Sequence, residues 1–182
     1  LPDMVKKVDF IIHLAGENRP ADEKDFDIVN AGLTASICEV VRSTGRQIPI
    51  ILASSTQATL GNAYGKSKLD AEITAENFGT DTGSPVFIYR LPAVFGKWCK
   101  PNYNSVVATF CYNICHNLPI QVNDSSFELS LVYIDDVIDE LKNMLSMDRL
   151  IADANELTYT LDLQELCTSN DDDDDDDDDH IE

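Results

Sequence analysis

The sequence has few basic residues and lacks any long apolar run. Its 182 residues include 13 Lys and Arg against 33 Asp and Glu, which gives a formal net charge of −20. Binding to nucleic acid depends on clustered Lys and Arg, so we expect no nucleic-acid partner. A helix that crosses a bilayer needs about 20 consecutive apolar residues. No segment approaches that length, so we also expect no membrane partner.

Signals for disulfides and for export are missing as well. The five Cys are an odd number and show no Cys-x-x-Cys spacing, which argues against a disulfide framework and for reduced thiols. The first seven residues are too polar for a signal peptide. These features predict a cytoplasmic protein. Since the first residue is leucine, we expect the sequence to be a piece of a longer reading frame or a trimmed one.

The composition predicts one globular body followed by an unfolded tail. Hydrophobic residues make up 43% of the chain, and its length is sufficient for a domain with a proper core. Ten of the negative charges lie in 171–182, which leaves a net −10 on the rest. This like-charged run is predicted to be disordered and is assigned no catalytic role. Its composition leaves the collection of divalent cations open as an alternative.

Hydrophobic periodicity predicts strands that alternate with helices. The predicted helices are 25–44, 64–78, 103–117 and 135–146, and the predicted strands are 8–14, 48–53, 86–90 and 129–133, with a short one near Ile120. A partial late strand and helix are expected within 151–170, as a strand over 157–163 leading into a helix near Asp162. This alternation predicts βαβ units and right-handed crossovers. The fold class is therefore α/β, with a doubly wound parallel sheet.

A Tyr-x-x-x-Lys motif begins the second predicted helix. Residues at i and i+4 share one helix face, so Lys68 is predicted to place its ammonium beside the Tyr64 phenol and to lower the pKa of that phenol. A tyrosine in this setting can give or take a proton near neutral pH. The Tyr-x-x-x-Lys spacing by itself is a weak signal, because Tyr and Lys are common enough to fall four residues apart by chance. The strand before it ends in the hydroxyls of residues 54–56.

Flanking segments strengthen this interpretation. Residues 9–16 read as a strand that runs into a small-residue turn, 86–92 as a strand broken by proline, and 131–137 as a strand that runs into an acidic helix N-terminus. Together these elements resemble the extended short-chain dehydrogenase/reductase (NAD-dependent epimerase/dehydratase) family. Residues 95–106 and 120–124 are similar to its capsular-polysaccharide branch, whose members reduce a UDP-linked 4-keto-6-deoxy amino sugar.

The resemblance implies a Rossmann-like sheet that lacks its first βαβ portion, with 1–150 as the C-terminal part of the domain. NAD or NADP would lie across the carboxyl ends of the strands. Tyr64 would protonate the alkoxide that forms from the sugar ketone, and Lys68 would also reach the nicotinamide-ribose hydroxyls. Ser55 would hydrogen-bond the ketone oxygen, with Thr56 as the alternative. The alternative is that these hydroxyls only end the strand and begin a turn, because Ser and Thr favour such positions.

The resemblance also assigns the remaining contacts to cofactor and substrate. Ala15 and Gly16 permit close approach of the cofactor, and Asn30 helps to organise the site, unless it merely faces solvent. For the UDP-sugar, Trp98 would stack on the uracil, and Lys97 and Lys100 on either side of it would meet the diphosphate. Asn104 lies in the same loop, for which an ordinary connecting role remains open.

No metal site is predicted. Cys111 and Cys115 share a helix face and His116 follows, which invites a zinc hypothesis. A zinc site, however, needs three or four convergent ligands, and the sequence offers no second cluster.

Two features of the family pattern do not occur. A Gly-x-x-Gly-x-x-Gly turn, whose backbone N–H groups would hold the pyrophosphate, is absent. Ala93 stands where the family has a substrate-contacting Asn. We therefore expect this chain alone to bind NAD(P) weakly or not at all and to be inactive, with an exposed sheet edge prone to association. The resemblance implies a homodimer, and the alternative function is a non-catalytic truncated remnant that acts as a scaffold or interaction domain.

Overall fold

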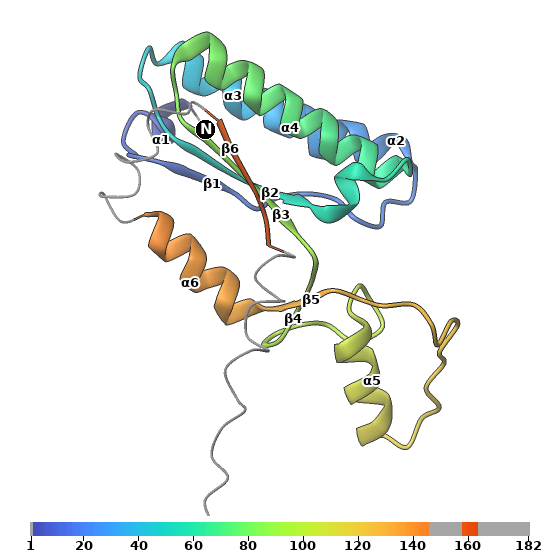
Figure 1. Cartoon of the computed structure of the whole chain (residues 1–182). Helices are drawn as coiled ribbons and strands as arrows, with labels where there is room; N and C mark the ends of the chain where they lie inside the picture. The colour runs from blue at the N-terminus through green and yellow to red at the C-terminus, as the bar shows by residue number, and fades with distance from the viewer. Residues whose placement is uncertain (1, 146–157, 164–182) are drawn as a thin grey trace, which may run out of the picture.

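A parallel sheet forms the centre of the computed structural model, which describes residues 2–145 and 158–163. Its strand order is β1-β2-β3-β6, and every neighbouring pair is parallel (Figure 1). The four strands are β1 (Ile11–His13), β2 (Ile50–Ser55), β3 (Val86–Leu91) and β6 (Thr158–Asp162). A second parallel pair joins β4 (Ala93–Phe95) to β5 (Leu131–Tyr133).

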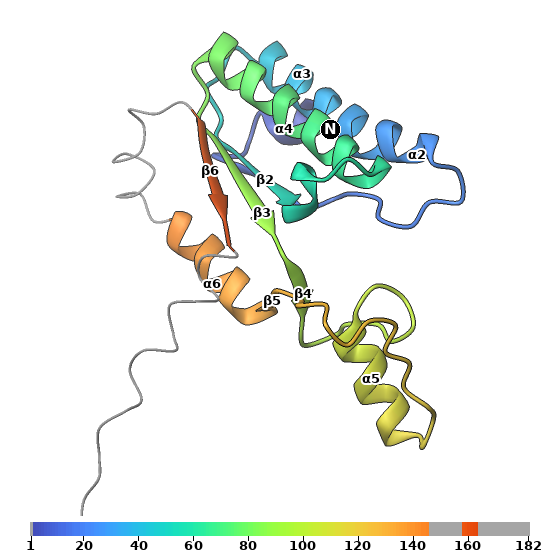
Figure 2. The same ribbon diagram turned by 45° about the vertical axis from the view of Figure 1, so that its right-hand side comes forward.

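Helices cover both faces of the central sheet. The helices of the described residues are α1 (Pro2–Val5), α2 (Lys24–Phe26), α3 (Leu33–Ser43), α4 (Ala63–Thr82), α5 (Val106–Cys115), which lies away from the sheet, and α6 (Ile134–Met144). A π-helical segment, η1 (Asp27–Gly32), joins α2 to α3, and a 3-10 turn, η2 (Thr56–Thr59), follows β2. Figures 1 and 2 show α3 and α4 side by side on one face and α6 on the other. The doubly wound α/β class is thus confirmed.

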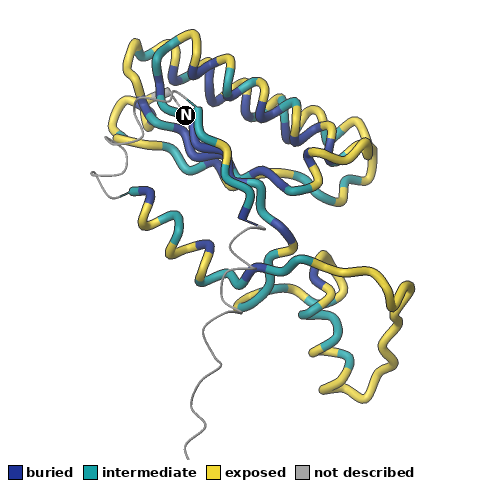
Figure 3. Tube along the Cα trace, viewed as in Figure 1, coloured by how far each residue is buried: buried dark blue, intermediate teal, exposed yellow. Residues whose placement is uncertain are grey.

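The two faces of the sheet carry separate apolar clusters. Successive residues of a strand point to opposite faces, so Ile50 and Leu52 pack with α3 and α4 while Ile51 packs with α6. β3 repeats this division, with Ile88 in the first cluster and Phe87 in the second. Burial on both faces explains why these strands read as continuous apolar runs. The buried residues accordingly follow the central strands (Figure 3).

The elements β4, β5 and α5 extend away from the carboxyl ends of the central strands (Figure 2). No strand was predicted over residues 93–95, but they form β4, which pairs with β5 through Ala93↔Leu131. The strand predicted near Ile120 is wrong, because residues 116–130 contain no strand and Ile120 is 47% exposed. An apolar alternation forms a strand only where a partner strand completes its hydrogen bonds.

The late strand predicted over 157–163 is confirmed as β6, which pairs with β3 through Val86↔Thr158. The helix predicted near Asp162 and the predicted disordered tail at 171–182 lie outside the described residues. Within the described part of the chain, no helix is both long and apolar enough to cross a membrane.

Candidate active site

The start of α4 is packed tightly against the turn that follows β2. The Asn62 side chain caps the helix by accepting a hydrogen bond from Gly65 N at 2.7 Å. A Cβ added at Gly65 would lie 2.1 Å from the Gln57 carbonyl oxygen, so no larger residue fits. This close approach sets Ser55, the last residue of β2, against Tyr64 in the first turn of α4.

Tyr64 and Ser55 interact within this contact. The Ser55 side chain is buried, and its Oγ accepts from Gln57 N at 3.2 Å. Burial raises the pKa of Tyr64, and a hydrogen bond with Ser55 offsets part of the rise. The Phe26 ring lies 5.7 Å from the Tyr64 ring, centroid to centroid. The predicted lowering of the Tyr64 pKa by Lys68 is therefore wrong in direction, because loss of solvent outweighs the other influences.

Lys68 points to the end of the sheet. Its side chain is buried, and Nζ donates to the Ala53 carbonyl oxygen at 3.0 Å. Burial lowers the pKa of Lys68, while the Glu72 carboxylate raises it. A Cβ added at Gly16 would lie 3.1 Å from Lys68 Nζ, so the glycine lets the chain after β1 pass directly over the ammonium. The small-residue turn after β1 thus meets the Tyr-x-x-x-Lys helix.

Asn30 fastens the β1–α2 loop to α4. It is 2% exposed, its Nδ2 donates to Ser67 Oγ at 2.8 Å and to the Glu17 carbonyl oxygen at 3.0 Å, and its Oδ1 accepts from Glu17 N at 2.8 Å. The alternative of a solvent-facing Asn30 is therefore wrong. Asn30 lies in the π-helical segment η1, and π-helical turns inside α-helices are frequent at functional sites.

His13 lies buried beneath the same cluster. Its Nε2 is 3.1 Å from Thr34 Oγ1. Burial lowers the pKa of His13 from its ordinary value of 6.5, and the Lys68 ammonium lowers it further. His13 is therefore neutral in the folded protein at neutral pH, which fits a structural role.

The lowered pKa of His13 predicts an acid-dependent loss of stability. Below pH 6.5 the unfolded chain protonates His13 more readily than the folded protein does, so the free energy of unfolding falls as the pH drops through this region. Urea unfolding between about pH 7.5 and about pH 5.5 measures the fall. We expect His13→Gln to have a smaller fall over that range, and an unchanged slope would contradict the assignment.

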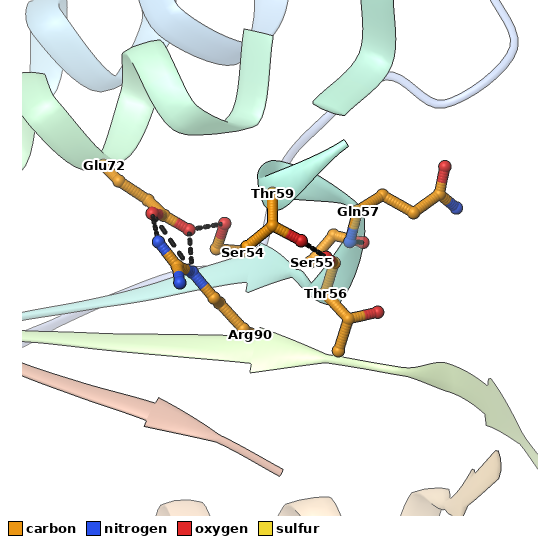
Figure 4. A network of polar contacts seen from close by, with 7 residues as sticks. All are labelled: Ser54, Ser55, Thr56, Gln57, Thr59, Glu72 and Arg90. Atoms are coloured by element: carbon orange, nitrogen blue, oxygen red, sulfur yellow. Dashed lines mark hydrogen bonds and ion pairs between the residues drawn. The ribbon is translucent and has the colours of Figure 1, made fainter. Parts of the chain in front are cut away.

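A buried ionic network, which the sequence interpretation missed, lies beside these residues (Figure 4). Glu72 is 1% exposed and receives a hydrogen bond from the Ser54 hydroxyl. Arg90 Nη2 donates to Glu72 Oε2 at 2.6 Å, and Arg90 Nε donates to Glu72 Oε1 at 3.1 Å. Ser54 precedes Ser55 and Glu72 follows Lys68 by one helical turn. The four-residue spacing of Tyr64, Lys68 and Glu72 could have shown that Glu72 shares their helix face, but it gives no sign of Arg90.

The predicted substrate-contacting residues lie apart from that cluster, in the loop between β4 and α5. Lys97 Nζ pairs with Asp135 at 2.6 Å, and this contact raises the pKa of Lys97. Trp98 is 98% exposed and has a φ of 68°, a conformation that is uncommon outside glycine. Asn104 is also exposed.

Ala15, the other predicted cofactor contact, lines an apolar groove of about 370 Å³ along β1. The groove also includes Phe10, Leu14, Leu33 and Ile37. Among the described residues β1 is the terminal strand of the central sheet, so the groove runs along the edge of that sheet.

No group of three or more His, Cys, Asp or Glu side chains within the described ranges could hold a metal ion. Cys111 and Cys115, which prompted the zinc hypothesis, are both exposed on α5.

The chain is similar to several known proteins. Residues 1–155 match the NAD dependent epimerase/dehydratase family. A UDP-2-acetamido-2,6-beta-L-arabino-hexul-4-ose reductase from Pseudomonas aeruginosa is 56% identical over 138 residues, which are 76% of this chain and 37% of that protein. The chain thus spans little more than a third of this curated relative.

Two solved structures show the same fold. The capsular polysaccharide assembling protein CapF from Staphylococcus aureus has 45% identity and a TM-score of 0.70, over 80% of this chain and 40% of its own. A UDP-glucuronic acid 4-epimerase from Bacillus cereus, solved with UDP-glucuronic acid and NAD, has a TM-score of 0.74 over 88% of this chain and 55% of its own. At 15% identity the epimerase supports the fold alone.

Proposed function

Because the chain belongs to the NAD dependent epimerase/dehydratase family, we propose that it provides the proton-donating part of a nucleotide-sugar oxidoreductase. The substrate would be a UDP-linked 4-keto-6-deoxy amino sugar, reduced with NADH or NADPH. The observation that carries the proposal is the contact of half-buried Tyr64 with Ser55 at the end of β2, where the buried Lys68 ammonium also donates to the Ala53 carbonyl oxygen. The reductase name of the Pseudomonas aeruginosa relative supports the direction of the reaction.

In the proposed reaction the side chains supply the proton and orient the ketone. The Ser55 hydroxyl donates a hydrogen bond to the ketone oxygen and holds the carbonyl in line. NADH or NADPH, when bound, supplies the hydride to the carbonyl carbon. As the C=O π electrons move onto oxygen, Tyr64 gives its phenolic proton to that oxygen, and the Lys68 ammonium stabilises the phenolate that remains.

Tyr64 holds the proton that the reduction needs. Burial raises the pKa of Tyr64, so the phenol is protonated at neutral pH, and its phenolate must be stabilised when it gives that proton to the more basic alkoxide. Burial also lowers the pKa of Lys68, and the phenolate formed during the reaction would favour the charged ammonium.

The remaining predicted contacts complete the proposal. Gly16, whose backbone passes over Lys68, and Ala15 would face the cofactor, with Asn30 holding their loop in place. Trp98, Lys97 and Asn104 would approach the nucleotide-sugar from the β4–α5 loop. In this proposal Lys97 must release Asp135 before it can bind a phosphate.

A fusion protein tests the function. Joining the N-terminal segment of the Pseudomonas aeruginosa relative to this chain would add the dinucleotide-binding unit that the family resemblance implies. We expect the fusion protein to oxidise NADPH or NADH, followed at 340 nm, when given a UDP-linked 4-keto-6-deoxy amino sugar. A folded fusion protein that consumes neither cofactor would favour the alternative of a non-catalytic scaffold.

A further inference from the structure

The buried Glu72 carboxylate joins three elements of the candidate active site. Glu72 belongs to α4, the Ser54 hydroxyl donates to it from β2, and Arg90 donates to it from β3 through Nη2 and Nε at 2.6 Å and 3.1 Å (Figure 4). Ser54 and Arg90 are partners in the parallel register of β2 and β3, so their side chains leave the same face of the sheet. One carboxylate therefore ties the ends of two strands to α4.

Ser54 lies between the two residues of β2 that contact the predicted proton-donating side chains. The Ala53 carbonyl oxygen accepts from Lys68 Nζ at 3.0 Å, and Ser55 hydrogen-bonds with Tyr64. A displacement of Ser54 would move both of its neighbours, because they share its backbone. The hydrogen bond from Ser54 to the helix therefore fixes the acceptor of Lys68 and the partner of Tyr64 together.

The charged and titratable groups that face Lys68 come from β1, α4 and β3. His13 of β1 is neutral at neutral pH, and Tyr64 of α4 keeps its proton because burial raises its pKa. Glu72 of α4 is the anion that acts on Lys68. Burial lowers the pKa of Lys68, and the Glu72 carboxylate raises it. Glu72 thus opposes the loss of charge that burial favours at Lys68.

Arg90 of β3 is the cation that lets this carboxylate be buried. A buried charge is tolerated when it is paired and hydrogen-bonded, and the two-point contact of a guanidinium with a carboxylate meets both needs. The hydrogen bond with Glu72 raises the pKa of Arg90, and the nearby carboxylates of Asp162 and Glu76 raise it further. Arg90 therefore stays charged and paired with Glu72.

We propose that Glu72 is a positioning residue for the proton transfer, which keeps the Lys68 ammonium charged and holds the end of β2 so that Ser55 stays against Tyr64. This proposal rests on the function proposed above, in which the ammonium stabilises the phenolate. Glu72 is 1% exposed, so it acts through its neighbours and not by contact with the substrate.

The pKa of Lys68 in the 182-residue chain tests the first part of the proposal. In protein with 13C-labelled lysine, the Cε signal follows the titration, and the signal missing from Lys68→Arg identifies it. Glu72→Gln is expected to lower the pKa of Lys68, because burial then acts without an opposing anion. Asp81→Asn removes an exposed carboxylate near the other end of α4 and is expected to leave that pKa unchanged.

A double variant separates positioning from stability. Glu72→Leu/Arg90→Met removes both charges and fills the space with apolar side chains, so it is expected to be more stable than Arg90→Met alone. In the fusion protein, Glu72→Gln and the double variant are each expected to lower kcat about tenfold, with the KM for the sugar nearly unchanged. A merely structural role predicts instead that the folded double variant recovers both the wild-type kcat and the wild-type pKa of Lys68.

The outcomes separate this proposal from the proposed function. An unchanged pKa of Lys68 in Glu72→Gln and in the double variant, or a wild-type kcat in the folded double variant, would overturn the positioning role. Either result leaves turnover by the wild-type fusion protein, and so the reductase assignment, intact. Conversely, a fusion protein without turnover would overturn the reductase assignment, while a lowered pKa of Lys68 in Glu72→Gln would still support the control of the Lys68 charge by Glu72.

Discussion

Replacing Tyr64 with Phe is expected to lower the kcat of the fusion protein by a factor of about 10² to 10⁴. The substitution keeps the ring, which packs against Phe26 with centroids 5.7 Å apart, and removes only the hydroxyl that carries the proton. The loss therefore belongs to the transition state, and cofactor affinity is expected to stay nearly unchanged. Steady-state oxidation of NADPH and a separate titration with NADPH measure the two quantities.

A matched substitution controls for the loss of a phenol elsewhere. Tyr112 lies on the exposed helix α5, and Tyr112→Phe is expected to leave kcat unchanged. Retention of wild-type turnover by Tyr64→Phe would show that Tyr64 is not the acid. A raised KM with an unchanged kcat would instead place Tyr64 in ground-state binding of the sugar.

Replacing Arg90 with Met is expected to lower the free energy of unfolding by about 3–5 kcal/mol. The substitution leaves the carboxylate of Glu72, which is 1% exposed, without the cation that approaches it at 2.6 Å. Within the network of Figure 4, the Ser54 hydroxyl would remain hydrogen-bonded to Glu72. Urea unfolding monitored by circular dichroism measures the change.

A surface ion pair provides the control for this prediction. Arg42 pairs with Asp81 at 3.2 Å, and both side chains are largely exposed. Arg42→Met is expected to change the free energy of unfolding by at most about 1 kcal/mol. The double variant Glu72→Leu/Arg90→Met removes both charges and is expected to recover much of the loss. Equal effects of Arg90→Met and Arg42→Met would contradict a special role for the buried pair.

Much of the fold was predictable because its signals are local. The apolar runs at β2 and β3, the amphipathic α3 and the helix that carries Tyr64 are set by residues close together in the chain. The short strands were predicted less well. β4 exists because β5 lies beside it, whereas the apolar residues near Ile120 have no partner strand among the described residues.

In the candidate site, too, the features set by local spacing were predictable and those set by contacts between distant segments were not. The Tyr-x-x-x-Lys spacing and the turn at Gly16 identified the residues that meet at the carboxyl ends of the strands. The direction of the Tyr64 pKa was mispredicted, because the solvent that each group loses depends on residues distant in sequence. Glu72 and Arg90 lie on α4 and β3, and nothing in either segment alone shows that they form one ion pair.

The sequence by itself determined the order of the longer strands and helices, the acidic charge and the placement of Tyr64 and Lys68 on one helix, since each follows from the period of a local pattern or from composition. Only the tertiary structure decided which groups lose water and which charges are paired. Burial and Coulomb energy depend on distance in space, and chain folding sets that distance.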